Sequence, residues 1–288
     1  MKKIIIPLAL LLVAVACKSP LNEEIKETPV PQKNAKNFTF TIKGDFGAAV
    51  FTRGYLQADG QDMTDLWVFD FVNGQCVQSM HQTNSDADWG TPKMSLAYGQ
   101  HHVYFVASRG AEPSLDESGH VLSWQTVRDT FWKDYEVSVV STSNGNRAVT
   151  LDRVATKLRV AVNDEVPSGC ATLSITPDRW YYGLNYVTGA AVSAQKKAIS
   201  VSVPSSYIGT TGQLVMSVFG ISSADEWTTN VAVTATDASS NVIGSASISG
   251  APFKRNRATE YSGNLFNSSG GLDVSVNTNW ETSRVGTW

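Results

Sequence analysis

The residues at the start of the chain whose spacing could direct a chemical reaction are Ala14-Val15-Ala16-Cys17. They stand at the end of an apolar stretch, Ile4 to Val15, which two lysines precede. This stretch is too short to span a bilayer. Residues 1–16 therefore predict a lipoprotein signal peptide that is removed during export. We expect the Cys17 thiol to form a thioether to diacylglycerol before cleavage and to anchor the chain to an envelope membrane. Ordinary secretion with cleavage at the same small residues is the alternative.

The histidines are the next residues whose types could do chemistry, as metal ligands. His101 and His102 are adjacent, so on a strand their side chains point to opposite faces and cannot share a metal. His81 and His120 have no set of Cys, Asp or Glu at ligand spacing, and His81 is expected in a polar loop. Asp86-Ala87-Asp88 lacks the glycine and glutamate of a calcium loop. We therefore expect surface histidines, with no metal and no cofactor.

Among catalytic motifs, the sequence contains neither a nucleophile elbow nor a phosphate-binding loop. The segment Asp225-Glu226-Trp227 is acidic and aromatic, but it does not make a glycosidase pair by itself. We therefore expect a protein that is not an enzyme. One aromatic group could stack on sugar rings, but a packed loop between strands is the favoured interpretation; its members are Trp180, Tyr181, Tyr182 and Trp227.

The composition excludes some partners and indicates a compartment. The formal net charge of −3 gives no electrostatic basis for binding nucleic acid. Charged residues are only 17% of the chain, and such a balance is typical of extracellular β-proteins. Cys76 and Cys170 could form a disulfide in an oxidising compartment, but two separate buried thiols are the favoured interpretation.

The hydrophobic pattern predicts mainly strands. Residues 17–36 are rich in proline and glutamate and read as a solvated tether. The spacing of Trp124, Val127, Phe131 and Tyr135 predicts one short helix over 123–135. Alternating or continuous apolar runs predict strands at 38–43, 66–72, 102–108, 137–140, 158–163, 171–175, 199–203, 214–219, 231–236, 242–248, 259–266 and 272–276.

The polar stretch at 141–146 is the best boundary between two domains. It divides the chain into an N-terminal domain, residues 37–145, which contains the helix, and a C-terminal domain, residues 146–288. Because few helical patterns separate the strands, parallel βαβ architecture is excluded. The expected fold is all-β, with two antiparallel β-sandwiches in series.

Several segments together resemble the fimbrillin family, which forms the stalk, anchor and accessory subunits of fimbriae in Bacteroides-type bacteria. The resemblance runs from Phe38 to the end of the chain, and it implies two transthyretin-like β-sandwiches. The segments that carry it are Met63–Asp70, Val103–Ser108, Leu151–Leu158, Phe253–Thr259 and the C-terminal Asn279-Trp280 and Gly286-Thr287-Trp288.

The resemblance also implies assembly by strand exchange. In that family a surface protease cuts after an arginine and releases a first strand, and the C-terminal strand of another subunit fills the groove. Carried onto this chain, the cut lies at Arg53-Gly54. The released filler strand contains Phe38, Phe40 and Ile42, and the donor strand contains Leu272, Val274 and Val276. In the alternative interpretation Arg53 is an ordinary loop residue and 272–276 is a final strand of its own sheet.

The function expected from the sequence is therefore a structural stalk or accessory subunit of a fimbrium that supports cell adhesion. Its partners would be other fimbrial subunits, a surface protease and, through the lipid anchor, the bacterial outer membrane. An uncleaved anchor subunit and a surface glycan-binding lipoprotein are the alternatives.

Overall fold

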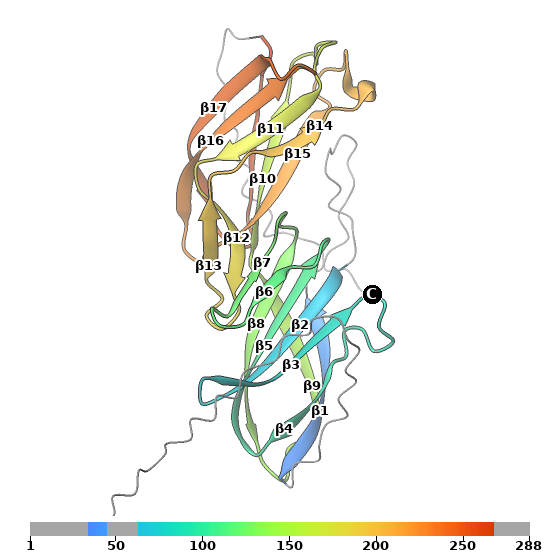
Figure 1. The fold of residues 1–288 in the computed structure, drawn as a ribbon, viewed down its shortest axis with the longest axis vertical. Helices are drawn as coiled ribbons and strands as arrows, with labels where there is room; N and C mark the ends of the chain where they lie inside the picture. The colour runs from blue at the N-terminus through green and yellow to red at the C-terminus, as the bar shows by residue number, and fades with distance from the viewer. Residues whose placement is uncertain (1–33, 45–62, 268–288) are drawn as a thin grey trace, which may run out of the picture.

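The computed structural model describes residues 34–44 and 63–267, and this part of the chain is almost entirely β-structure (Figure 1). The all-β class predicted from the sequence is confirmed. One three-residue 3-10 helix, η1 (Ser205–Tyr207), interrupts the strands. Within the described ranges, no helix is long and apolar enough to cross a membrane.

The N-terminal strands form a seven-stranded sheet in the order β3-β2-β5-β8-β9-β1-β4. Strands β8 and β9 pair at only two positions, so the sheet is divided there into two parts. Its strands are β1 (Ala35–Gly44), β2 (Met63–Val72), β3 (Gln75–Thr83), β4 (Lys93–Ala97), β5 (Gly99–Arg109), β8 (Thr130–Val139) and β9 (Asn146–Arg153).

A first hydrophobic core lies between the two parts of this sheet. It joins side chains of β2, β5 and β8 to side chains of β1, β4 and β9, which is the arrangement of a sandwich. Its fully buried aromatic and leucine members include Phe38, Phe40, Phe105, Leu66 and Leu96.

Strand β2 is apolar on both faces because it lies between two hydrophobic cores. Leu66 and Val68 belong to the first core, whereas Trp67, Phe69 and Phe71 belong to a second core on the other face. The period of two along a strand separates the two sets. The β2–β3 connection is a tight hairpin turn at Asn73 and Gly74, which both have positive φ, at 51° and 76°.

The remaining strands form three smaller sheets, with orders β15-β10-β18, β14-β11-β16-β17 and β13-β12-β7-β6. Figure 1 shows the first two at the opposite end of the molecule from β1 and β4. The strands are β6 (Ser114–Asp116), β7 (Val121–Ser123), β10 (Ala155–Val162), β11 (Thr172–Pro177), β12 (Trp180–Asn185), β13 (Ala191–Gln195), β14 (Ile199–Ser202), β15 (Leu214–Ile221), β16 (Trp227–Thr236), β17 (Val242–Phe253) and β18 (Ala258–Gly263).

Two strand pairs depart from the expected antiparallel arrangement. Strand β1 runs parallel to β9, and β10 runs parallel to β18. Each pair joins segments that are far apart in the sequence, as a parallel pair requires. The alternation predicted for β10 is confirmed, because Leu158, Val160 and Val162 are all buried in the second core.

The helix predicted over 123–135 is wrong, because β7 ends at Ser123 and β8 begins at Thr130. The apolar residues that suggested one helical face belong to different elements and different cores. Trp124 and Val127 lie in the connection and enter the second core, whereas Phe131 enters the first core from β8. Their spacing of three and four residues therefore results from two separate packing surfaces.

Two features join the N-terminal and C-terminal parts of the chain. The β6–β7 hairpin pairs with β12, so one small sheet contains strands from both parts. Strand β9 begins at residue 146, directly after the boundary predicted from the sequence, and pairs with β1 and β8. The division into residues 37–145 and 146–288 remains a prediction.

Candidate functional site

Strand β1, which contains the predicted filler residues, lies inside the first sandwich. Phe38 and Phe40 are both 0% exposed, and Ile42 is half-buried at the edge of the same core. The ring of Phe40 makes edge-to-face contacts with Phe105, at 5.2 Å between centroids, and with Tyr135, at 6.0 Å. The alternation in the sequence puts these aromatic rings inward, as predicted.

The backbone of β1 is bonded on both sides. Its first half pairs antiparallel with β4, and its second half pairs parallel with β9. Beyond β4, the amide of Phe40 donates to the Pro92 carbonyl and that of Ile42 donates to the Gly90 carbonyl, each at 3.0 Å. Removing β1 would leave unpaired ladder groups on both neighbouring segments.

The start of β9 forms one wall of this site. The amide of Thr39 donates to the Gly145 carbonyl at 2.7 Å. A Cβ atom at Gly145 would lie 2.1 Å from the carbonyl oxygen of Asn37, so only glycine allows β1 to approach this closely. The guanidinium of Arg147 lies over the Phe38 ring, 5.3 Å from its centroid, and covers the outer end of the site.

The other residues of the strand-exchange prediction lie outside the described residues. These are the lipidation site Cys17, the processing site Arg53-Gly54 and the donor residues Leu272, Val274 and Val276.

The aromatic group predicted as a sugar-stacking surface is divided by the structure. Trp180 is 0% exposed, and its indole Nε1 donates to the Phe219 carbonyl at 2.8 Å. Tyr182 is also buried, and burial raises the pKa of its hydroxyl. Neither ring can stack on a ligand, so both are corrected to core residues. They alternate on β12 with Tyr181, which is why only that ring reaches the surface.

Tyr181 and Trp227 remain partly exposed and lie side by side, with ring centroids 5.2 Å apart. The guanidinium of Arg179 lies over both rings, 5.1 Å from the Trp227 centroid and 5.8 Å from the Tyr181 centroid. This small aromatic and cationic surface is the part of the predicted platform that is accessible.

His101 and His102 lie on opposite faces of β5, as predicted. His101 is not a surface residue, however, because it is 2% exposed and bonded to buried Asp70 at 2.7 Å. Its other nitrogen, Nε2, lies 2.9 Å from the Ala97 carbonyl and must donate there. Burial raises the pKa of the Asp70 carboxyl, against the opposing effect of His101. Asp70 is a charged residue within the apolar run of β2, and a buried charge needs a partner. That was the signal in the sequence for the contact with His101.

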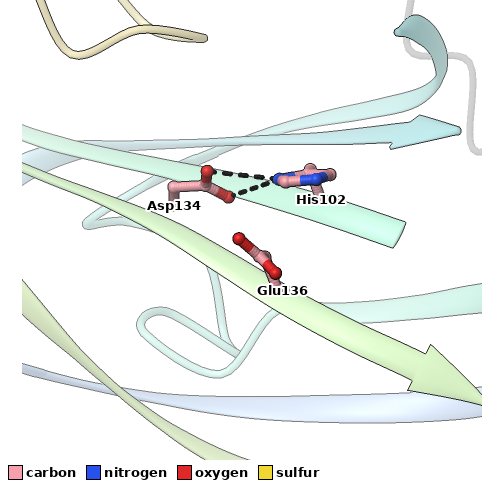
Figure 2. A group of neighbouring side chains, drawn as sticks. All are labelled: His102, Asp134 and Glu136. Carbon is pink, nitrogen blue, oxygen red and sulfur yellow. Dashed lines mark hydrogen bonds and ion pairs between the residues drawn. The ribbon is translucent and has the colours of Figure 1, made fainter. Parts of the chain in front are cut away.

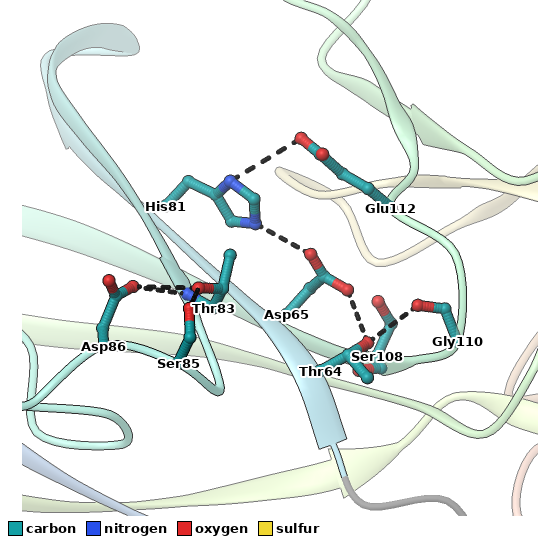
Figure 3. Close-up of polar contacts among 9 residues, drawn as sticks. All are labelled: Thr64, Asp65, His81, Thr83, Ser85, Asp86, Ser108, Gly110 and Glu112. Atoms are coloured by element: carbon teal, nitrogen blue, oxygen red, sulfur yellow. Dashed lines mark hydrogen bonds and ion pairs between the residues drawn. The ribbon is translucent and has the colours of Figure 1, made fainter. Parts of the chain in front are cut away.

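His81 lies on β3 rather than in the predicted loop, and it has carboxylate neighbours that are distant in the sequence (Figure 3). Its Nε2 is 2.9 Å from Asp65, which also accepts a hydrogen bond from the Thr64 hydroxyl at 2.6 Å. Its Nδ1 is 3.7 Å from Glu112. The His81 ring stacks on Trp67 with 3.9 Å between centroids. These contacts fix the ring against the sheet.

The aspartates that resembled part of a calcium loop have a structural role. Asp86 accepts a hydrogen bond from the Thr83 amide at 2.7 Å, and Asp88 accepts one from Gln82 at 3.0 Å, so this loop bonds to its own strand. Cys76 and Cys170 do not form a disulfide with each other, as favoured from the sequence, but only Cys170 is buried and Cys76 is half-buried.

Comparison with known families identifies the group to which the chain is related. Residues 114–285 match the family described as "Family of unknown function (DUF6562)". The chain belongs to this family. Among curated proteins, none matches the sequence.

Solved structures with a similar fold come from Bacteroides-type bacteria. This member of the DUF6562 family is 11% identical to "putative polysaccharide binding proteins (DUF1812)" from Bacteroides thetaiotaomicron VPI-5482, covering 86% of this chain and 99% of that chain with a TM-score of 0.52. A "putative adhesin" from the same organism is 9% identical, covering 89% and 100% with a TM-score of 0.52.

The tip fimbrial protein Mfa3 from Porphyromonas gingivalis, with a C-terminal truncation, aligns over 84% of this chain and 100% of its own at 12% identity and a TM-score of 0.43. At these identities the two structures with a TM-score of 0.52 show a shared fold, and their descriptions as adhesin and polysaccharide-binding proteins agree with the resemblance noted from the sequence.

Proposed function

We propose that the chain is a non-catalytic structural subunit of a cell-surface fimbrium and that it assembles by exchange of β1. The observation that carries the proposal is the position of β1, which lies between β4 and β9 with Phe38 and Phe40 completely buried. It is the first described strand, and it is followed by the segment that holds Arg53. Cleavage there would separate β1 from the rest of the chain.

The physical basis is the surface that β1 would leave behind. Burying one phenylalanine contributes about 1.5–3 kcal/mol, so loss of β1 would expose two deep apolar pockets together with unpaired backbone groups. A strand of another subunit with apolar residues at every second position could fill both. Leu272, Val274 and Val276 have that spacing, and we propose them as the donor.

We include three further features in the same proposal: the lipid anchor at Cys17, the outer-membrane location and two transthyretin-like sandwiches. Fold neighbours described as a "putative adhesin" and as fimbrial support a role in adhesion, and the two parts of the first sheet around one core support a sandwich. A stalk or accessory subunit is preferred to an uncleaved anchor subunit.

Treatment of the purified chain with an arginine-specific protease tests this proposal. We expect the wild type to form SDS-resistant ladders and the Arg53→Ala variant to remain monomeric. Truncation after Gly271 should also prevent ladders while leaving the N-terminal sandwich folded by circular dichroism. Ladders from intact Arg53→Ala protein would remove the processing step, and a cleaved wild type that stays monomeric would overturn strand exchange.

The filler strand itself is tested by a matched pair on β1. Phe40→Ala removes a completely buried ring, whereas Thr41→Ala changes an exposed neighbour. After cleavage, the first variant should release residues 34–44 and form ladders faster than wild type, and the second should not. Equal rates would show that β1 does not control assembly.

A surface glycan-binding protein is the second candidate, and the exposed Tyr181–Trp227 pair beneath Arg179 favours it. Stacking of sugar rings on such aromatic faces is the expected mode of binding. Retardation in affinity electrophoresis on polysaccharides should then be lost in Trp227→Ala and retained in Tyr98→Ala, which removes an exposed ring elsewhere. Absence of retardation in the wild type would exclude this candidate for the polysaccharides tested.

A further inference from the structure

Three side chains suited to binding a metal ion meet on one face of the first sheet, away from β1. His102 comes from β5, and Asp134 and Glu136 come from the neighbouring β8 (Figure 2). His102 lies directly opposite Glu136 in the strand register, and Asp134 lies opposite Tyr104. Residues two apart on a strand share a face, so all three side chains project to the same side.

The donor atoms are close enough to share one ion. One ligand atom from each residue lies within 4.8 Å of the others, and His102 Nδ1 is 3.1 and 3.2 Å from the two Asp134 oxygens. Small rotations of the three side chains would bring them to the distances of a metal centre, about 2.0–2.2 Å from nitrogen or oxygen ligands. The site is accessible, because 47% of the His102 side chain and 29% of the Asp134 side chain are exposed.

Asp134 and Glu136 carry negative charge, and His102 is the basic side chain that contacts Asp134 among the described residues. Within residues 34–44 and 63–267, no lysine or arginine forms an ion pair with Asp134 or Glu136. The nearest basic residue in sequence, Lys133, bonds to Asp152. A cation at this point would relieve the repulsion between the two carboxylates.

The strands hold the three residues in a fixed arrangement. Strand β5 pairs with β2 from His102 to Arg109 and with β8 from Gly99 to Ser108, so His102 has a paired strand on each side. The His102 ring also stacks on Tyr104, with 6.0 Å between centroids and 20° between planes. Ligands on rigid elements lose little conformational freedom when they bind an ion.

We propose that His102, Asp134 and Glu136 bind a divalent transition-metal ion of the Zn²⁺ type. One imidazole and two carboxylates are ligands that zinc accepts, whereas calcium prefers sites made of oxygen alone. The ion would replace the hydrogen bond between His102 and Asp134 and would keep a position open to solvent. The site is separate from β1, because none of the three residues belongs to that strand. Asp134 and Glu136 also face the opposite side of β8 from Tyr135, the residue whose ring contacts Phe40 of β1.

Isothermal titration of the full chain, stripped of metal with a chelator, tests this inference with ZnCl₂ as the probe. We expect one zinc site per chain whose affinity falls at least tenfold in His102→Gln and in Glu136→Gln. The matched control is Glu112→Gln, which removes an exposed carboxylate beside a different histidine, His81, and should leave zinc affinity unchanged. CaCl₂ should bind at this site far more weakly.

Nuclear magnetic resonance gives a second readout that does not depend on affinity. The ring signals of His102 should shift on zinc addition, whereas those of buried His101 should not. All four proteins should give the same circular dichroism spectrum, because the altered side chains are at the surface. Zinc binding that is absent, or that persists unchanged in both His102→Gln and Glu136→Gln, would overturn the inference.

Discussion

Phe69 and Tyr186 stack face to face, with 3.9 Å between ring centroids and 7° between ring planes. Phe69 lies on β2 of the seven-stranded sheet, and Tyr186 directly follows β12. The pair therefore joins the N-terminal sheet to the C-terminal part of the chain through the second core.

Tyr186→Ala should lower the free energy of unfolding by about 3–5 kcal/mol, because it leaves a cavity where a fully buried ring packed. Tyr98→Ala is the matched control, since Tyr98 is 43% exposed and its loss should cost little. Urea unfolding followed by tryptophan fluorescence measures both. Equal stability losses for the two variants would show that the stacked pair does not couple the two parts.

The buried Asp70–His101 pair should make stability depend on pH. Burial raises the folded-state pKa of Asp70 above 3.8, so its proton stabilises the fold at low pH. That contribution is complete below 3.8 and is lost as pH rises through the raised pKa. Asp70→Asn can donate to His101 without titrating, so its stability relative to wild type should increase with pH above 3.8. Unfolding measured across that range checks the trend, and parallel pH profiles would contradict it.

The same pair predicts a difference between two substitutions at one position. Asp70→Ala leaves His101 Nδ1 buried without a partner, which costs about 1–3 kcal/mol. Asp70→Asn preserves the hydrogen bond and should cost much less at neutral pH. A similar loss of unfolding free energy in both variants would show that the Asp70 carboxyl does not stabilise the fold through its hydrogen bond to His101.

Asp129 and Arg153 form a buried ion pair that should contribute far more than an exposed pair nearby. Two nitrogens of Arg153 bond to the two Asp129 oxygens at 2.8 and 3.1 Å, and a third bonds to Asn256 at 2.9 Å. Asp129→Ala removes the buried carboxylate that pairs with this guanidinium, and we expect a loss of about 3–5 kcal/mol in the free energy of unfolding.

The control for this prediction is Lys133→Ala, which breaks the exposed pair between Lys133 of β8 and Asp152 of β9, the residue before Arg153. Surface pairs contribute about 0–1 kcal/mol, and this one should weaken further in salt. Chemical denaturation at low and high salt distinguishes the two pairs. A loss below about 1 kcal/mol in Asp129→Ala would mean that burial does not strengthen the Asp129–Arg153 pair.

A strand could be predicted from the sequence where all of its alternating apolar residues pack into the same core. Residues 38–43 and 158–163 alternate, and β1 and β10 bury the expected residues. The prediction failed between 123 and 135, where Trp124 and Phe131 enter different cores. A periodicity analysis assigns all apolar residues to one surface, so it reads two surfaces as one helix.

That error also concealed the candidate metal site. The predicted helix ended at 135 and put Asp134 on a different element from Glu136, whereas on β8 the two residues share a face with His102 of β5. The pairing of β5 with β8 depends on long-range packing, which no local pattern in the sequence reports. For the same reason the His81–Asp65 and His101–Asp70 contacts could be located only in the folded chain.

Gly145 gives a specific way to loosen β1 without changing its own residues. An added methyl group would lie 2.1 Å from the Asn37 carbonyl oxygen, so Gly145→Ala must push β1 away from the start of β9. We expect a loss of about 1–3 kcal/mol, as for other overpacked sites. Hydrogen exchange should become faster at the amides of Thr39, Phe40 and Ile42, which are bonded to the neighbouring segments.

Gly169→Ala is the matched control, because nothing lies within 4 Å of the added methyl group there. Exchange in β1 should be unchanged in this variant. If β1 is the strand that leaves during assembly, Gly145→Ala should also form ladders faster after cleavage, because the exchange removes the clash. Faster exchange of β1 amides without faster ladders would separate the local contact from the proposed function, and unchanged exchange would show that β1 does not press against Gly145.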